Sequence, residues 1–493
     1  MMYRCLSSLL AALMTVAQVR SESECARGAS MLQTRSNVGT EACAPLTNRG
    51  TYFTVRTCVG TPPQCFDTVA DTGSDNVVVP SCVCDDLRDS GCERDEACFR
   101  GTNKSDTFSI PQKPGVVTLT FGSGSIQTAI ASDIVQVAGV EVNLTDGLLL
   151  ILSRAQLQVE GDFQGILGLG LPKRKGVDFE ANAAGALLTS KSNPYADGTA
   201  TAIICLLFPQ LCAAAAIPYP AAGTEPADSW KNKLFMDVAG VHRFSICFQD
   251  GEKPGALRLK VPEFAKPIPQ IGELHWGMSF HGISIGSETR EVLFCKPQEM
   301  ASGMKSPCGA IPDSGTTLLT GPTDQVRLLK EGLCQSWQRC NQSQGGPSAH
   351  KFDELLANCS DWLPEAGLTG LPSIFLHIPS AGAGNDSFEL TPWAWLTQFT
   401  VKNKTSCMSG FGTMDYDTAE NGQVWILGTP LFYEYTVGFD LHSRQVSLER
   451  GRCNPCVPDA ALVSADMDMD SRLMPRWQQG PPRLPRLDRN LPL

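Results

Sequence analysis

The sequence predicts an all-β protein of two pseudo-symmetric, β-barrel-like lobes around a central cleft. Three observations predict this fold. The chain of 493 residues is long enough for two lobes of about 150–200 residues each. Short β-type runs recur between turn residues, and two motifs occur twice in the same order. With 42% apolar and 18% charged residues, the composition is that of a globular chain rather than of a fibre or a disordered polymer.

The two repeated motifs indicate a duplicated lobe. Residues 69–74 (VADTGS) return as residues 311–316 (IPDSGT), and in each copy an apolar run leads into an acid, a hydroxyl residue and a glycine. Residues 165–169 (GILGL) return as residues 425–429 (WILGT), at a comparable distance after the first motif. Two motifs in the same order and at similar spacing are typical of an internal repeat.

Most of the chain reads as antiparallel strands. β-branched or alternating runs lie between Gly, Pro, Asn and Asp residues, most clearly at 52–58, 116–121, 126–137, 373–378 and 436–440. Few helices are expected, among them one near residues 324–333 and one near residues 351–357. Residues 172–230 and 296–307 read as insertions, so we expect them to be surface excursions.

The ends of the chain differ in composition from the middle. An apolar stretch after one positive charge and before small residues indicates a secretory signal peptide, with a buried N-terminal helix as the weaker alternative. The C-terminal end is rich in Pro, Arg and Asp, which favours disorder. The predicted segments are a signal peptide at 1–17, an N-terminal segment or short propeptide at 18–50, lobes at 51–254 and 255–456, and a disordered tail at 457–493.

Charge and cysteine content restrict the partners and the compartment. The balance of 40 Lys and Arg against 51 Asp and Glu gives a net charge of −11, which disfavours nucleic acid and anionic membranes as partners. Twenty cysteines indicate an oxidising compartment. We expect the secretory pathway, ending in secretion or in an acidic endomembrane lumen, with no membrane anchor. The predicted glycosylation sites are Asn103, Asn143, Asn341, Asn358, Asn385 and Asn403.

The repeated acids suggest a shared reaction centre. One Asp-Ser/Thr-Gly tripeptide is ordinary turn sequence, but two copies in a duplicated chain would bring Asp71 and Asp313 together between the lobes. Carboxylates that close share one proton, so one acts as acid and the other as base. A water molecule between them would lose its proton to one carboxylate while the other protonates a scissile carbonyl. This predicts peptide hydrolysis in acid, without a metal, a cofactor or a covalent intermediate.

The chain resembles the pepsin-like (family A1) aspartic peptidases, which are the standard example of such a proton-sharing pair. The match covers roughly residues 52–453. Its marks are residues 52–53, 60–63, 71–74, 79–81, 121–125, 165–169, 244–246, 313–317, 319–322 and 424–428. The resemblance implies a flap, which is a β-hairpin over the cleft, at residues 118–133.

The resemblance also assigns roles to individual residues. It implies that Asp71 and Asp313 are the catalytic pair. Ser74 and Thr316 would hydrogen-bond the outer carboxylate oxygens of the pair. Thr72 and Ser314 would link the two loops. Residues that would face the substrate are Gly73, Phe121, Gly122, Ser123, Gly315 and Thr317.

Three residues depart from the family pattern. Phe121 stands where the flap usually has Tyr, and Val78 where Trp usually receives its hydroxyl bond. Because both partners of one hydrogen bond are replaced, we expect a repacked flap. Pro312, directly before Asp313, lacks an N–H, and we expect a tolerated edge position rather than an inactive second loop.

The cysteines are expected to form disulfides. The resemblance implies the pairs Cys359–Cys407 and Cys247–Cys453. Local spacing suggests Cys58–Cys65, Cys205–Cys212, Cys295–Cys308 and Cys334–Cys340, with two further bridges among Cys82, Cys84, Cys92 and Cys98. Cys25, Cys43 and Cys456 remain, and pairing two of them would leave one thiol. Cys453 and Cys456 form one CxxC, with no second pair to complete a zinc site, so we expect no metal.

The sequence therefore predicts an aspartic endopeptidase that acts on proteins or peptides as a monomer. The alternative is a catalytically weak or inactive member of the same fold that acts as a binding or inhibitor-like protein. Loss of either acid would favour the alternative. Both acids are present with their hydroxyl neighbours, which favours the enzyme.

Overall fold

The computed structural model describes residues 41–87, 90–92, 97–111, 115–121, 124–157, 164–172, 233–251, 253–380, 385–401, 404–456 and 476–477. Two compact units are distinguished, Met1–Ala42 and Cys43–Leu493. Of the first, only Glu41 and Ala42 are described. The second contains both acid loops, so the functional site lies within one unit. The predicted signal peptide lies outside the described residues. The predicted insertion at 172–230 also lies outside them, except for Pro172.

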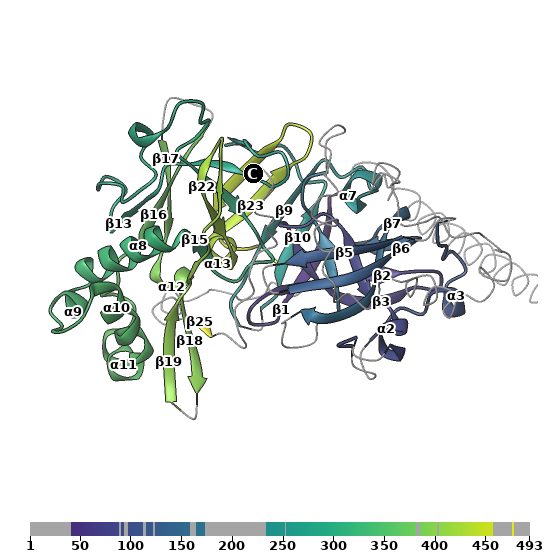
Figure 1. Cartoon of the computed structure of the whole chain (residues 1–493), viewed down its shortest axis with the longest axis horizontal. Helices are drawn as coiled ribbons and strands as arrows, with labels where there is room; N and C mark the ends of the chain where they lie inside the picture. The colour runs from purple at the N-terminus through teal and green to yellow at the C-terminus, as the bar shows by residue number, and fades with distance from the viewer. Residues whose placement is uncertain are drawn as a thin grey trace, which may run out of the picture. The chain divides into compact units, whose positions relative to one another are not determined.

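The N-terminal lobe and the strands that join the lobes share one long sheet (Figure 1). Within the described residues its order is β11 (Ile268–Pro269), β24 (Gln445–Arg450), β23 (Tyr435–Asp440), β9 (Arg243–Cys247), β10 (Gly255–Leu259), β1 (Ala42–Asn48), β2 (Phe53–Val59), β3 (Gln64–Asp71), β8 (Ile166–Gly168), β4 (Val77–Pro80), β7 (Val140–Leu157), β6 (Gly124–Val137) and β5 (Val116–Phe121). Strand β1 therefore belongs to this sheet. The predicted boundary between the N-terminal segment at 18–50 and the lobe at 51–254 would separate β1 from β2.

The C-terminal lobe is built from smaller sheets. The largest runs β12 (Met278–Phe280), β14 (Cys308–Pro312), β22 (Gly422–Leu427), β15 (Leu319–Gly321) and β20 (Phe411–Thr413), with β21 (Asp417–Thr418) paired to β22. Two three-stranded sheets contain β13 (Ile283–Ile285), β16 (Ile374–Pro379) and β17 (Asn385–Leu390), and β19 (Lys404–Ser409), β18 (Leu396–Val401) and β25 (Arg476–Trp477). The all-β, bilobal prediction is confirmed.

Each lobe packs its core behind the strand that carries its acid. In the N-terminal lobe, Val69 of β3 belongs to a buried apolar cluster with Val78 and Ile166. In the C-terminal lobe, Ile311 of β14 packs with Val424 and Ile426. Burial of these apolar side chains fixes both strands, because apolar area removed from water is the main stabilising term. The ends of the two strands are thereby held firmly in place.

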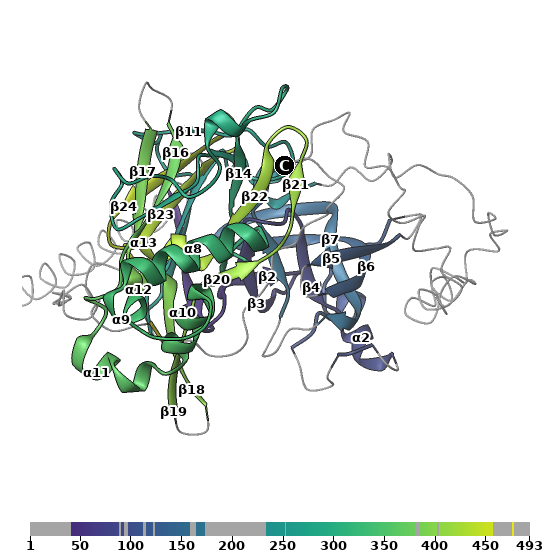
Figure 2. The ribbon, with the colours of Figure 1, turned by 60° about the vertical axis from the view of Figure 1, so that its left-hand side comes forward.

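Helices are few. They are α2 (Cys82–Asp86), α3 (Gly101–Lys104), α7 (Phe235–Val238), α8 (Thr323–Ser336), α9 (Gln338–Asn341), α10 (Ser348–Ala357), α11 (Leu363–Ala366), α12 (Pro392–Trp395) and α13 (Thr429–Glu434), with 3-10 turns η2 (Pro297–Glu299) and η3 (Cys359–Asp361). The two helices expected from the sequence are α8 and α10, which lie side by side (Figure 2) and are joined by an ion pair of 2.8 Å between Lys330 and Asp353. None of the helices within the described residues is long and apolar enough to span a membrane.

Eight disulfides occur among the described residues. They are Cys43–Cys456, Cys58–Cys65, Cys82–Cys98, Cys84–Cys92, Cys247–Cys453, Cys295–Cys308, Cys334–Cys340 and Cys359–Cys407. The first joins two of the three cysteines that the sequence left without a partner, and both cysteines of the CxxC pair are used. Cys25, Cys205 and Cys212 lie outside the described residues.

The predicted surface features are placed as follows. Asn103, Asn143 and Asn341 are exposed and Asn358 is half-buried, whereas Asn385 is described only as a backbone position in β17 and Asn403 lies outside the described residues. Residues 296–307 are largely exposed. Within the tail predicted to be disordered, Arg476 and Trp477 pair with β18 as the parallel strand β25. An edge strand such as β18 offers unpaired backbone groups to such a segment.

Candidate active site

The two acids occupy matching places in the two lobes. Asp71 is the last residue of β3, and Asp313 directly follows β14. Strand β3 pairs in parallel with β8, and β14 pairs in parallel with β22. The paired strands come from the second repeated motif. Each acid is thus presented at the end of a buried strand, and the repeat in the sequence is a repeat in structure.

The glycine of the second motif lets the two elements approach closely. A Cβ on Gly168 would collide with the backbone of Asn76, just after the first acid loop. A Cβ on Gly428 would collide with the backbone carbonyl of Thr316, within the second acid loop. Only glycine fits where backbones meet at this distance. The pairing of an acid motif with a Leu-Gly motif therefore has a steric cause.

The Asp71 carboxylate is held from within its own loop. The backbone N–H of Gly73 donates to Oδ1 at 3.0 Å, and the Ser74 hydroxyl donates to Oδ2 at 2.5 Å. The peptide N–H of Leu169 donates to the Asp71 carbonyl at 2.8 Å. The side chain is buried, with 6% of the residue exposed. Both its carboxylate oxygens and its backbone are therefore fixed.

The Asp313 carboxylate is held in the same way. The Gly315 N–H donates to Oδ1 at 2.8 Å, and the Thr316 hydroxyl donates to Oδ2 at 2.6 Å. Its own N–H donates to the Leu427 carbonyl at 3.0 Å. With 2% of the residue exposed, Asp313 is the more buried acid.

Four hydrogen bonds join the two acid loops across the lobes. The Thr72 hydroxyl donates to the Pro312 carbonyl at 3.0 Å and accepts from the Ser314 N–H at 3.0 Å. The Ser314 hydroxyl donates to the Ala70 carbonyl at 2.7 Å and accepts from the Thr72 N–H at 3.0 Å. Thr72 and Ser314 are fully buried. This reciprocal network sets the position of one loop relative to the other.

The two carboxyl groups face each other. A Cβ on Gly73 would lie 2.7 Å from Oδ2 of Asp313, and one on Gly315 would collide with the Asp71 carboxylate. Burial raises the pKa of Asp313 from its ordinary value of 3.8 to about 7, and the charge of Asp71 adds to the rise. Hydrogen bonds from Thr316 and Gly315 act in the opposite direction. Asp313 therefore keeps its proton in acid.

Comparison with known proteins matches this arrangement. The family described as eukaryotic aspartyl protease matches residues 51–191 and 265–450. The chain belongs to this family. Both acid loops and the second motif of each lobe lie within the matched residues, so the family assignment and the site geometry concern the same parts of the chain.

Individual members of the family are distant relatives. Pepsin II-1 of Oryctolagus cuniculus is 25% identical over 426 residues, which cover 84% of each chain. Cathepsin E of Mus musculus is 25% identical over 401 residues, covering 81% of this chain and 79% of the relative. Renin of Ovis aries is 24% identical over 398 residues, covering 80% and 79%. The similarity extends over both lobes.

The flap of this family member is only partly described. Strands β5 and β6 form an antiparallel hairpin in which Phe121 pairs with Gly124. Gly122 and Ser123, between them, lie outside the described residues, and Phe121 is placed by its backbone alone. Two pairs before the tip, Leu119 and Ile126 share a buried apolar cluster with Val78 of β4. Valine at position 78 thus takes part in apolar packing beneath the flap.

Pro312 sits where no ladder bond is lost. Strand β14 pairs with β12 through Cys308, Gly309 and Ala310, so β12 stops two residues before Pro312. On the other side Pro312 pairs with Leu427 of β22. The strand is internal to its sheet, which corrects the expected edge position. Proline is tolerated because the side facing β12 is already unpaired there.

The remaining predicted residue has a partner in the other lobe. Thr317, expected to face the substrate, donates its hydroxyl to the Thr51 carbonyl at 2.8 Å and is 4% exposed. The sequence did not indicate this contact or the one between Trp276 and Leu169, because Thr51 and Trp276 lie outside every motif. Among the described residues no group of three His, Cys, Asp or Glu side chains is arranged to hold a metal ion.

Proposed function

We propose that the protein is an aspartic endopeptidase that hydrolyses internal peptide bonds of proteins in acid. The observation that carries the proposal is the pair of facing carboxylates, each with both oxygens hydrogen-bonded and each buried between the lobes. Membership of the eukaryotic aspartyl protease family supports it. An inactive binding protein would not need both acids kept in this geometry.

The two acids take different roles in the reaction. The buried Asp313, with its raised pKa, holds the shared proton and donates it to the carbonyl oxygen of the scissile bond. Asp71 accepts a proton from a water molecule held between the carboxylates, and that water attacks the carbonyl carbon. The proton on Asp71 then passes to the amide nitrogen as the C–N bond breaks, and the new carboxyl group returns a proton to Asp313, which restores the pair. No covalent enzyme intermediate is needed.

The surroundings of the pair favour this chemistry. The loops are rigid because the Thr72 and Ser314 network ties them together, so little reorganisation is required as charge develops. The singly protonated pair is populated in acid, where we expect the highest rate. We infer an acidic lumen of the secretory route or the exterior as the site of action, because eight disulfides are present among the described residues.

The test is digestion of an unfolded protein from about pH 2 to about pH 8, with cleaved bonds mapped by mass spectrometry. Asp71→Asn removes the base, and a statine-type inhibitor blocks the pair. We expect internal cleavage by the wild type in acid, inhibited by the statine compound and absent from the variant. Equal cleavage by Asp71→Asn, or no cleavage by the folded wild type at any pH, would overturn the proposal.

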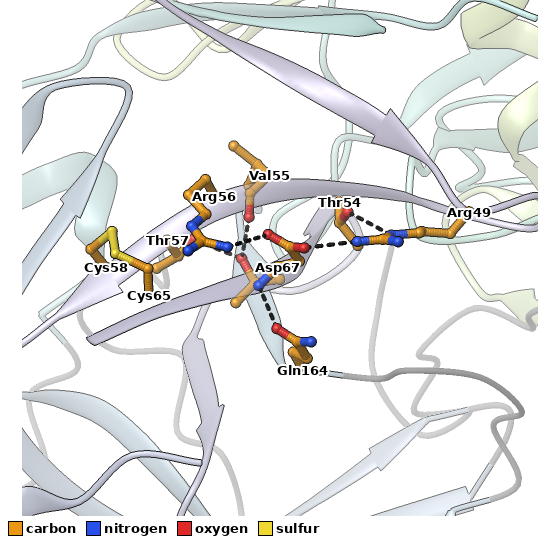
Figure 3. A network of polar contacts seen from close by, with 10 residues as sticks. Arg49, Thr54, Val55, Arg56, Thr57, Cys58, Cys65, Asp67 and Gln164 are labelled. Carbon is orange, nitrogen blue, oxygen red and sulfur yellow. Dashed lines mark hydrogen bonds and ion pairs between the residues drawn. A yellow bond between two sulfur atoms is a disulfide. The ribbon is translucent and has the colours of Figure 1, made fainter. Parts of the chain in front are cut away.

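Strand β3 also supplies a matched control. Asp67 lies four residues before Asp71 on the same strand, at the surface, where it pairs with Arg49 at 2.7 Å and Arg56 at 3.2 Å (Figure 3). Its backbone N–H donates to the Gln164 side chain at 2.9 Å, and that bond does not need the carboxylate. Asp67→Asn therefore makes the same chemical change outside the site. We expect full activity and a stability loss below about 1 kcal/mol.

A further inference from the structure

We propose that Trp276 is a positioning residue for the acid pair, acting on Asp71 from the opposite lobe through two successive hydrogen bonds. The proposal rests on the proposed peptidase function but is tested separately from it. It concerns a residue outside both repeated motifs and outside both acid loops.

The first observation is the pair of bonds. The indole Nε1–H of Trp276 donates to the Leu169 carbonyl at 3.1 Å, and the Leu169 N–H donates to the Asp71 carbonyl at 2.8 Å. Leu169 closes the second motif of the N-terminal lobe. All the atoms involved are buried, since Trp276 and Leu169 have no exposed surface. Trp276 is thus linked to the Asp71 backbone through one intervening residue, Leu169, whose carbonyl accepts one bond and whose N–H donates the other.

The second observation is how firmly the indole is placed. Its ring lies 5.0 Å from the ring of Phe439 on β23 and 6.1 Å, edge-on, from that of Phe244 on β9. These two phenylalanines stack on each other at 4.8 Å. Strands β9 and β23 are neighbours in the long sheet that joins the lobes. The donor is therefore held by aromatic packing on a rigid sheet.

The third observation links the same segment to the second acid. Trp276 lies two residues before Met278, and Met278 pairs with Ala310 on β14, the strand that directly precedes Asp313. The loop before it is closed by a bond of 2.8 Å from the Ile271 N–H to the Gly277 carbonyl. The segment from Ile271 to Met278 thus makes two contacts. Its backbone pairs with β14, and the Trp276 indole bonds Leu169, which in turn bonds Asp71. It fixes the distance between the acids in addition to the Thr72 and Ser314 network.

Loss of the indole N–H would leave the buried Leu169 carbonyl without this partner. Leu169 would then relax, and Asp71, which its N–H holds, would move relative to Asp313. Small displacements of reacting groups lower the rate of the chemical step much more than they change substrate binding. The expected signature is a loss in kcat at nearly constant KM.

The experiment compares two buried tryptophans with the same kind of bond. Trp276→Phe removes the donor while keeping an aromatic ring. Trp362→Phe is the control, because its Nε1–H donates to the Leu355 carbonyl at 2.8 Å and its ring packs on Trp337, in the helical region of the C-terminal lobe. If Trp276→Phe does not fold, benzothienylalanine at position 276 keeps the ring shape and removes only the N–H.

For Trp276→Phe we expect kcat to fall about tenfold, with KM within about twofold of the wild type. The basic limb of the pH profile should move to lower pH, because Asp71 would stand farther from Asp313 and its charge would hold the proton less strongly. Trp362→Phe should lower the melting temperature by a similar amount and leave kcat and the pH profile unchanged. A kcat and pH profile that are unchanged in Trp276→Phe, or that change equally in Trp362→Phe, would overturn the proposal.

A readout that needs no activity separates this proposal from the proposed function. The wild type loses stability as the pH rises through the titration of the pair, and this loss should end at lower pH in Trp276→Phe but not in Trp362→Phe. If the wild type proved inactive, this shift would still support the positioning role while the peptidase proposal failed. Absence of the shift overturns the positioning role whatever the activity.

Discussion

The two acid loops are alike in what holds the carboxylate and differ in what supports the loop. In each, a glycine N–H and a hydroxyl bond the two oxygens. The second motif begins with Gly165 in the N-terminal lobe and with Trp425 in the C-terminal lobe. Trp425 is fully buried, stacks on Phe294 at 5.4 Å and donates its indole N–H to Gln325 at 2.7 Å.

The source of the support therefore differs between the lobes. In the C-terminal lobe the support comes from a tryptophan of the same lobe, because Trp425 pairs with Ala310 of β14, three residues before Asp313. The N-terminal loop has a glycine there, whose Cβ would collide with the Val78 backbone, and is braced by Trp276 from the other lobe. Duplication preserved the chemistry of the loops, while the packing behind them diverged. Asp71 should accordingly be the acid more sensitive to changes at the lobe interface.

The largest effect should come from neutralising either acid. Asp71→Asn and Asp313→Asn should each lower kcat/KM by on the order of 10³-fold or more, because the first removes the base of the pair and the second removes the acid. The measurement is hydrolysis of a quenched fluorescent peptide, with Asp67→Asn as the charge-matched control. A large loss in one variant and a small loss in the other would show that the acids do not act as a pair.

The network between the loops should have the next largest effect. Thr72→Val and Ser314→Ala each leave buried groups of the other loop unpaired, so each should lower the free energy of unfolding by roughly 2–4 kcal/mol. The double variant should lose less than the sum of the two, because the four bonds form one unit. Urea unfolding checks both statements. Additive losses would indicate that the loops are not coupled.

Burial of Asp313 predicts how stability depends on pH. Its folded pKa is raised above the unfolded value of 3.8 to about 7, so the folded state binds more protons in this window and stability falls as the pH rises through it. The loss is on the order of a few kcal/mol. Asp313→Asn removes the titration, so the variant should lose less stability than the wild type over this range. Equal pH dependence in both proteins would contradict the assignment.

A smaller effect should follow loss of one hydroxyl. Thr316→Val removes a bond that lowers the pKa of Asp313, so the basic limb of the pH profile should move to higher pH. This direction is opposite to that expected for Trp276→Phe. The rate should fall by roughly a few-fold, since the Gly315 bond remains. A shift to lower pH would mean that the Thr316 hydroxyl does not stabilise the ionised form of Asp313.

The acid loops could be predicted because their information is local. Six residues specify each strand end, its acid, its hydroxyl and its glycine, and duplication makes the signal visible. The same is true of disulfides between near neighbours, such as Cys58–Cys65, which are seven residues apart. Helices α8 and α10 were found because each has one apolar face over several turns.

Features that depend on distant packing could not be predicted. Trp276 and Leu169 are 107 residues apart, and Cys43 and Cys456 are 413 apart, so spacing says nothing about either contact. Helix α13 was missed because all six of its residues are buried, which leaves no amphipathic pattern. The edge position expected for Pro312 was wrong for a related reason. The sequence indicates that the missing N–H of Pro312 faces no hydrogen-bonding partner. It does not indicate that the reason is the end of the pairing with β12 at Ala310.

The most direct test of the account is the pH dependence of kcat/KM for one peptide, measured with the wild type and both Asn variants. We expect a bell-shaped profile in acid for the wild type, since a singly protonated pair is required, and no measurable profile for Asp71→Asn or Asp313→Asn. The contradicting result is a rate that stays flat from about pH 3 to about pH 8, or either variant retaining more than about a tenth of the wild-type rate.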